Sequence, residues 1–210
     1  MNRFLIIIIF ALQACSAFDL QEYPRVAKVM LFGAQDINVS KDFYDSASYS
    51  FAHVEIGRFK KSIMILASIK DGNFLWVGPA GEQIFTRNGK IVKTYGLEYN
   101  LKKIQAKDLI FSNNSYDYAS IIQLKNPDAL ITKRYKLTPI TKETYTFNDL
   151  IQQGQAVNGF FVEYREDFKT EKLRWSGENL YWLNSDGRVV KTIQKYHPFE
   201  SSVIMTFYYK

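Results

Sequence analysis

The sequence predicts a mainly β protein, an antiparallel β-sandwich or barrel-like fold with one or two short N-terminal helices. From Tyr49 onward, short apolar runs alternate with polar positions, as strands with one buried face do. The dipeptides Asp71-Gly72, Asn88-Gly89 and Asp186-Gly187 separate neighbouring runs and are strong hairpin signals. All five prolines lie between runs. The 47% hydrophobic content excludes a disordered chain and supplies a core.

The first residues are typical of an export signal. A single charge, Arg3, precedes an apolar run at residues 4–12, which is nine residues long. A membrane-spanning helix needs roughly 20 apolar residues, so this run fits the short core of a secretory signal peptide.

The end of this run, Leu12-Gln13-Ala14-Cys15, resembles the lipobox of bacterial lipoproteins. The resemblance implies cleavage before Cys15 and covalent lipid on its sulfur and amine. Residues 1–14 are then a signal peptide, 15–21 a lipidated tether and 22–210 a single β-rich domain. Bacterial lipoproteins that stay in the inner membrane typically carry Asp after the lipidated cysteine. Ser16 stands at that position here, so the same resemblance implies that the protein is placed in the outer membrane. The alternative is an ordinary signal peptide cleaved after Ala17, with a free cysteine.

Helix signals occur only before the strands. Apolar residues recur at three- and four-residue spacing over residues 23–31, Pro24 suits a first turn and Gly33 a helix end, which predicts one helix. Ser40 is positioned to cap a second short turn over residues 41–46.

The strands are expected in two groups. The first is a five-stranded meander over residues 49–96, in which residues 62–69 are apolar on both faces, as in a strand covered on both sides. Residues 98–115 are polar and predict a loop or short helix, and residues 154–158 break the pattern. Later strands are expected at residues 118–124, 130–137, 145–147, 159–164, 172–175, 179–183, 189–193 and 202–209.

A faint repeat links two parts of the chain. An aromatic strand, a turn and a Val-Lys-Thr run occur at residues 74–94 and again at residues 180–192. The repeat has two explanations. One is a pair of similar β units, at about residues 49–97 and 159–210, and the other is a coincidence of hairpin chemistry.

Composition excludes several kinds of site. One cysteine permits neither an internal disulfide nor a site of several thiolates. His53 and His197 lack any catalytic or metal-binding motif, so we expect no metal and no cofactor besides the lipid on Cys15. The net charge of +6 is spread over turns. With an export signal present, it indicates an anionic membrane or acidic glycan and not nucleic acid.

Two sets of residues are candidates for contact chemistry. Glu163, Glu166 and Asp167 form the densest carboxylate group, but interleaved cations favour a solvated strand end with local ion pairs over a glycosidase pair. Trp76 and Trp182 occupy matching places beside two hairpins, where they either stack on sugar or pack in the core. Tyr196 and His197 are further candidate contacts for glycan or a protein partner; the sequence assigns no catalytic residue.

Two blocks of sequence stand out as motifs. The first comprises LASIKDG at residues 66–72, Trp76 and TRNGKIVKTYGL at residues 86–97. The second comprises NLYWL at residues 179–183, GRVV at residues 187–190, Gln194 and Pro198. Together they resemble the YjbF/GfcB family of bacterial outer-membrane lipoproteins. The resemblance implies a role in exopolysaccharide or group 4 capsule production or export, with envelope export proteins as partners.

The expected function is therefore that of a non-enzymatic, lipid-anchored accessory protein at the periplasmic face of the outer membrane, acting by protein or glycan binding. One alternative is a glycan-modifying enzyme that uses Glu163 and Glu166. Another is a lipid carrier with a cavity lined by residues such as Ile65, Leu66 and Phe160.

Overall fold

The computed structural model describes residues 39–210, except residues 58–60, 106–108, 141–142, 153–154 and 172. Asp36–Lys210 forms one compact unit. The expected signal peptide, Cys15, the tether and the helix expected from Tyr23 lie outside the described residues.

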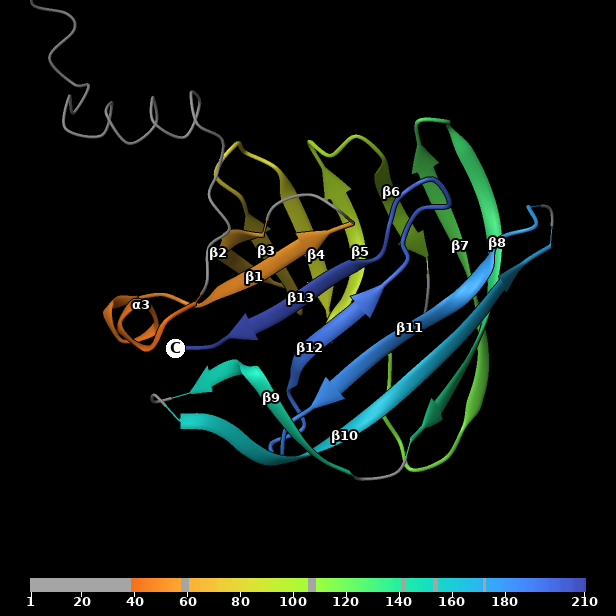
Figure 1. Cartoon of the computed structure of the whole chain (residues 1–210). Helices are drawn as coiled ribbons and strands as arrows, with labels where there is room; N and C mark the ends of the chain where they lie inside the picture. The colour runs from red at the N-terminus through yellow and green to blue at the C-terminus, as the bar shows by residue number, and fades with distance from the viewer. Residues whose placement is uncertain (1–38, 58–60, 106–108, 141–142, 153–154, 172) are drawn as a thin grey trace, which may run out of the picture. The chain divides into compact units, whose positions relative to one another are not determined.

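The described residues of this unit form one helix and thirteen strands (Figure 1). In chain order they are α3 (Lys41–Ser46), β1 (Phe51–Ile56), β2 (Ser62–Lys70), β3 (Asn73–Val77), β4 (Gln83–Arg87), β5 (Lys90–Tyr95), β6 (Asn100–Gln105), β7 (Tyr116–Lys125), β8 (Ala129–Pro139), β9 (Glu143–Gln152), β10 (Gln155–Thr170), β11 (Ser176–Leu183), β12 (Val189–Gln194) and β13 (Val203–Tyr208).

The strands form one antiparallel sheet that curls into a nearly closed barrel (Figure 1). Twelve of them follow the order β5-β4-β3-β2-β1-β13-β12-β11-β10-β8-β7-β6, and β9 pairs with β10 beside this path. The two ends of the path, β5 and β6, meet through a side chain, because the Leu101 amide donates to Thr94 Oγ1 at 2.8 Å. The barrel-like architecture expected from the sequence is confirmed.

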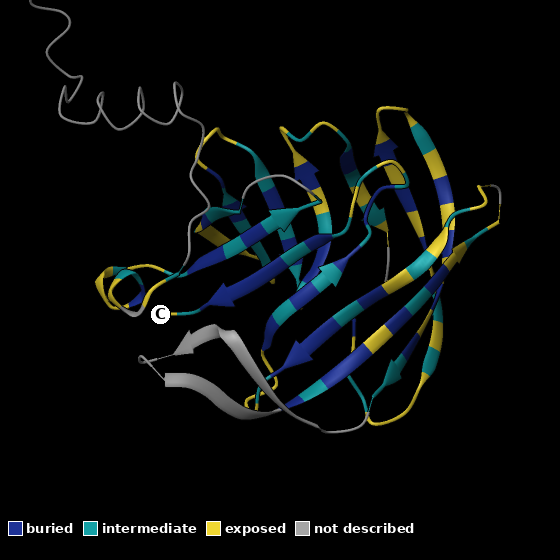
Figure 2. Ribbon diagram, viewed as in Figure 1, coloured by how far each residue is buried: buried dark blue, intermediate teal, exposed yellow. Residues whose placement is uncertain are grey.

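The interior is filled by alternate residues of the strands, which produces the banding of buried and exposed positions in Figure 2. Trp76 and Tyr181, both with 0% exposure, belong to a single large apolar cluster inside the barrel. A smaller cluster of Phe161, Trp182 and Val190 lies apart from it.

The expected helix cap and hairpins are confirmed. The Ser40 side chain accepts from the Phe43 amide at 3.1 Å and begins α3, so the short helix expected here is present. In the β4–β5 turn, Asn88 and Gly89 have φ of 48° and 75°, as a type I′ hairpin requires.

Three expected segments differ from the structure. Residues 100–105 form β6 and not a loop or helix. The sequence pattern does not predict this strand because a register shift between Leu101 and Lys103 interrupts the alternation that marks a strand. Residues 173–175 form a tight turn before β11. The break expected over residues 154–158 is absent from Gln155 onward, where β10 runs continuously.

The middle of β2 also differs from expectation. Although β2 lies between β1 and β3, Ile65 and Ile69 are 40% and 59% exposed, so the strand is not covered on both faces.

The β4–β5 turn is held close to β12. A Cβ added to Gly89 would lie 2.5 Å from Val189 Cγ1, whereas a Cβ added to Gly72, which also has a positive φ, would meet nothing within 4 Å. Gly89 is therefore needed both for its positive φ and for its lack of a side chain.

We predict that Gly72→Ala lowers the free energy of unfolding by about 1–2 kcal/mol, the cost of the left-handed conformation alone. Gly89→Ala should cost about 1–3 kcal/mol more because it also overpacks the contact with Val189. Urea unfolding of the two variants gives this difference directly. Equal losses would show that the close approach to Val189 has no energetic consequence.

Candidate functional site

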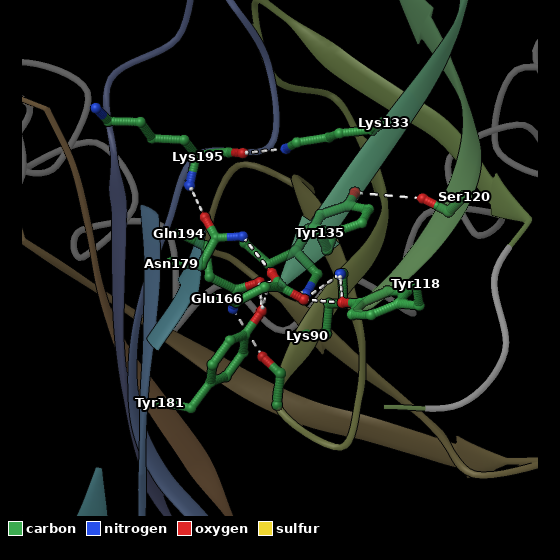
Figure 3. A network of polar contacts seen from close by, with 12 residues as sticks. Lys90, Tyr118, Ser120, Lys133, Tyr135, Glu166, Asn179, Tyr181, Gln194 and Lys195 are labelled. Atoms are coloured by element: carbon green, nitrogen blue, oxygen red, sulfur yellow. Dashed lines mark hydrogen bonds and ion pairs between the residues drawn. The ribbon is translucent and has the colours of Figure 1, made fainter. Parts of the chain in front are cut away.

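A buried ion pair occupies the centre of the barrel (Figure 3). Glu166 of β10 has 0% exposure. Its Oε1 accepts from Lys90 Nζ at 2.6 Å and from the Tyr118 hydroxyl, and its Oε2 accepts from Asn179 Nδ2 at 2.5 Å and from the Tyr181 hydroxyl at 3.0 Å. The carboxylate thus has four donors from three strands, β5, β7 and β11, which satisfies it fully in a buried interior.

The cation of this pair is equally enclosed. Lys90, the first residue of β5, is 6% exposed, and its Nζ also donates to the Tyr118 hydroxyl at 2.7 Å. The ammonium lies 3.8 Å from the ring centroid of Tyr135, a distance at which the ring's negative face attracts a cation. Burial, reinforced by Glu166, raises the pKa of Tyr181 well above its ordinary value, so its hydroxyl stays a donor to the carboxylate.

Gln194 of β12 joins the same centre to the β4–β5 hairpin. Its Nε2 donates to the Gly89 carbonyl at 2.7 Å, and its Oε1 accepts from the Ile91 amide at 2.9 Å. One side chain therefore binds both polar backbone groups that flank Lys90, which fixes where the lysine enters the barrel.

A second buried lysine lies nearby. Lys133 of β8 is 3% exposed and donates to the Lys195 carbonyl at 3.2 Å. Its Nζ lies 3.4 Å from the ring centroid of Phe168 and 4.1 Å from that of Trp175. Burial, together with repulsion from Lys90, lowers the pKa of Lys133 well below its ordinary value, and the rings offset part of this effect.

The expected solvated carboxylate group is wrong for two of its three members. Glu166 is fully buried inside the barrel, with 0% exposure. Glu163 is only 9% exposed, and its Oε2 accepts from Trp182 Nε1 at 3.2 Å. Only Asp167 behaves as expected, in a half-exposed pair with Arg165 at 3.3 Å. The local sequence is misleading because the donors to these carboxylates come from distant strands.

Glu163 and Glu166 also lie on opposite faces of β10. Residues three apart on a strand point to opposite sides, and their neighbours agree. Glu166 lies among interior groups, while Glu163 contacts Trp182 of the separate smaller cluster. The strand therefore does not bring the two together across one cleft as a glycosidase requires.

The candidate contact residues are all buried. Trp76 donates from Nε1 to Thr86 Oγ1 at 2.9 Å inside the barrel, and Trp182 is 7% exposed. Both tryptophans therefore pack in the core and are not free to stack on sugar. The Tyr196 hydroxyl donates to the Tyr99 carbonyl at 2.8 Å. The His197 ring stacks on Tyr99 at 5.1 Å, and burial lowers the pKa of His197, which favours its neutral form.

A cleft opens at one end of the barrel. It has a volume of about 1280 Å³ and lies among the β4–β5 and β11–β12 turns and residues 109–111, with Leu66, Phe74 and Tyr164 among its apolar lining. Of the residues expected to line a lipid cavity, Leu66 does so and Ile65 does not, while the side chain of Phe160 lies outside the described residues.

Metal-ligand clusters and membrane-spanning helices are both absent from the described part of the chain. No group of three or more histidine, cysteine, aspartate or glutamate side chains is arranged there to hold a metal ion. No helix there has the length and apolar character needed to cross a membrane.

The fold defines the class of the protein as a nearly closed antiparallel barrel with a buried polar centre. A similar fold occurs in the crystal structure of the hypothetical lipoprotein YmcC from Escherichia coli (K12), with a TM-score of 0.67 and 18% identity over 87% of this chain and 93% of that one. The family of the group 4 capsule polysaccharide lipoproteins gfcB and YjbF matches residues 25–208, so the chain belongs to that family.

One curated relative is similar along almost its whole length. The uncharacterized lipoprotein YjbF of Escherichia coli (strain K12) is 26% identical over 207 residues, which cover 95% of each chain. The resemblance stated from the two sequence blocks is thereby confirmed.

The residues around Glu166 were not among the candidates predicted from residue type, although the two sequence blocks contain several of them. Lys90 lies in the first block, and Asn179, Tyr181 and Gln194 lie in the second. The structure brings the two blocks together around Glu166 (Figure 3). Lys133 also had a signal, since it occupies the apolar phase of an alternating strand, where a lysine requires a partner.

We predict that Glu166→Gln lowers the free energy of unfolding by about 3–5 kcal/mol, because it leaves the Lys90 ammonium buried without a counter-charge. Glu171→Gln is the matched control, since it breaks the exposed ion pair with Arg134 and should cost no more than about 1 kcal/mol. Chemical denaturation measures both. Similar small losses would mean that the central pair is not the constraint described here.

We predict that Lys133 makes stability depend on pH. Between its lowered native pKa and the ordinary lysine value of about 10.4, the unfolded chain binds more protons, so the free energy of unfolding rises with pH. Lys133→Met should remove that rise and stabilise the protein at neutral pH, whereas Lys136→Met, at an exposed position of the same strand, should do neither. Unfolding curves from about pH 7 to about pH 9.5 test this; identical slopes for all three proteins would refute it.

Proposed function

We propose that the protein is a lipid-anchored accessory factor in the production or export of capsule or exopolysaccharide. In this proposal, lipid on Cys15 holds the barrel at the periplasmic face of the outer membrane, where it binds export proteins or the glycan. The observation that carries the proposal is the family match over residues 25–208, joined to the lipobox that ends at Cys15.

The geometry of the carboxylates supports binding over catalysis. Both oxygens of Glu166 are occupied by donors, and Glu163 lies on the opposite face of β10 and accepts from Trp182. A general acid or base must reach its substrate's proton. These groups instead hold the fold together, so we propose that the protein has no enzymatic activity.

The cleft at the end of the barrel favours one second candidate, a lipid carrier. Its volume of about 1280 Å³ and its apolar lining residues suit an acyl chain. Mass spectrometry of lipids extracted from the purified protein discriminates between the two: stoichiometric lipid beyond the covalent anchor supports a carrier, and its absence supports an accessory factor.

We predict that deletion of the gene strongly reduces surface polysaccharide and that the unaltered gene restores it. Glu163→Gln should restore it equally well, since the amide oxygen still accepts from Trp182 Nε1. Quantification of uronic acid and hexose on washed cells gives the result. Normal polysaccharide in the deletion strain would contradict the proposed function, and loss of activity in Glu163→Gln would favour an enzyme.

We predict that Cys15→Ala abolishes both membrane anchoring and restoration of surface polysaccharide, because two or more acyl chains are what hold such a domain on a bilayer. Membrane fractionation and metabolic labelling with palmitate measure the anchor. Retention of the unlabelled variant in the outer-membrane fraction would contradict the proposed role of the lipid.

A further inference from the structure

A basic groove runs over the outside of the barrel across β2 to β6. Its volume is about 390 Å³. We define it by the half-buried ring of Phe85 and by five cations, Lys70, Arg87, Lys93, Lys102 and Lys103.

Strand register brings these side chains into two adjacent rows. Lys70 pairs with Asn73, which lies beside Arg87 and accepts from its Nε at 3.0 Å. Phe85 pairs with Leu75 on one side and Lys93 on the other. Lys102 and Lys103 follow on β6, across the seam where the barrel is not closed by backbone pairing. Cations that are far apart in the sequence thus face one channel.

Among the described residues that line the groove, cations outnumber carboxylates. Its five cations share the lining with one exposed carboxylate, Asp71, and the nearby Asp128 pairs with Lys102 at 2.9 Å. In the part of the chain that the structure describes, Lys70, Lys93 and Lys103 form no ion pair. Like charges held side by side repel one another, so the groove is stabilised by an added anion.

A second surface cleft of this barrel provides the comparison. Its lining cations Arg134, Lys136, Lys169 and Lys195 are interspersed with the carboxylates Asp117, Asp167 and Glu178. The charge excess is therefore a property of the groove on β2 to β6 and not of every concave surface on this basic protein.

The floor of the groove is apolar and contains an aromatic ring. Phe85 and Leu75 are half-buried side by side, and Lys93 Nζ lies 5.1 Å from the centroid of the Phe85 ring. An aromatic ring can stack on the C–H face of a sugar, while flanking ammonium groups attract carboxylate or phosphate substituents. A row of charges along a recessed channel also matches a linear polymer better than the flat surface of a bilayer.

We propose that this groove binds an acidic polysaccharide, with Lys70, Lys93 and Lys103 holding its anionic groups and Phe85 stacking on a sugar ring. The inference rests on the proposed function and names the class of ligand and the surface that takes it. The buried pair of Lys90 and Glu166 supports the groove from within, since Lys90 also reaches its inner end.

The test measures binding of carboxymethyl-dextran, with unmodified dextran as the neutral probe, to the full-length protein in detergent. We expect calorimetry to show binding of the charged polymer only, weakening steeply between about 0.01 M and about 0.15 M ionic strength. The combined variant Lys70→Gln, Lys93→Gln and Lys103→Gln should weaken binding by about tenfold or more.

Two control proteins separate the groove from net charge and from folding. The combined variant Lys136→Gln, Lys169→Gln and Arg174→Gln removes the same charge from exposed positions elsewhere and should change affinity by less than about twofold. Phe85→Leu keeps an apolar floor but removes the ring, and should weaken binding by about threefold with an unchanged melting temperature.

Three results would overturn the proposal. They are equal weakening by the two triple variants, equal binding of charged and neutral dextran, and a groove variant that loses binding only to vesicles of phosphatidylglycerol while it keeps binding carboxymethyl-dextran. The last result would assign the groove to an anionic membrane.

Surface polysaccharide in the deletion strain separates this inference from the proposed function. If the groove variant loses glycan binding but the deletion strain has normal polysaccharide, the site stands and the proposed function fails. If the deletion strain lacks polysaccharide but the groove variant binds glycan and restores export as the unaltered protein does, the function stands and the site fails.

Discussion

The rest of the barrel depends on the full satisfaction of one buried carboxylate. Glu166 is acceptable inside an apolar interior only while Lys90, Tyr118, Asn179 and Tyr181 all reach it. Because these donors come from β5, β7 and β11, a slip of any one strand by a residue would turn its donor to the opposite face. A buried ion pair adds little net stability over an apolar core, but it penalises every arrangement in which a partner is missing. The pair thus selects one register for a sheet of many similar short strands.

The backbone contacts of Gln194 extend this selection across the barrel. By bonding to the Gly89 carbonyl and the Ile91 amide, this side chain draws the β4–β5 hairpin onto β12, and the absence of a side chain at Gly89 permits the approach to Val189. In the proposed function, these polar groups inside the barrel are structural. The proposed contacts with glycan lie instead on the outer surface, where the groove on β2 to β6 gathers five cations.

Local signals predicted most of the fold. Alternation, the Asn88-Gly89 turn and the Ser40 cap each act over a few residues, and each is found where the sequence indicated. The strand missed at residues 100–105 has a register shift that moves its apolar residues out of period, so no short window can recognise it. The sequence likewise could not separate a sandwich from a barrel, because closure depends on how β5 and β6 meet after all the other strands have paired.

By itself the sequence determined the strand-rich class, the turns and the two blocks that mark the family. It could not determine which charges are buried, because Glu166 looks solvated beside Arg165 and becomes interior only when donors arrive from other strands. It could not locate the basic groove either, since Lys70 of β2 and Lys103 of β6 line one groove only in the folded barrel. Propensities and turn chemistry act along the chain, whereas charge burial and surface charge density are set by residues that only the closed sheet brings together.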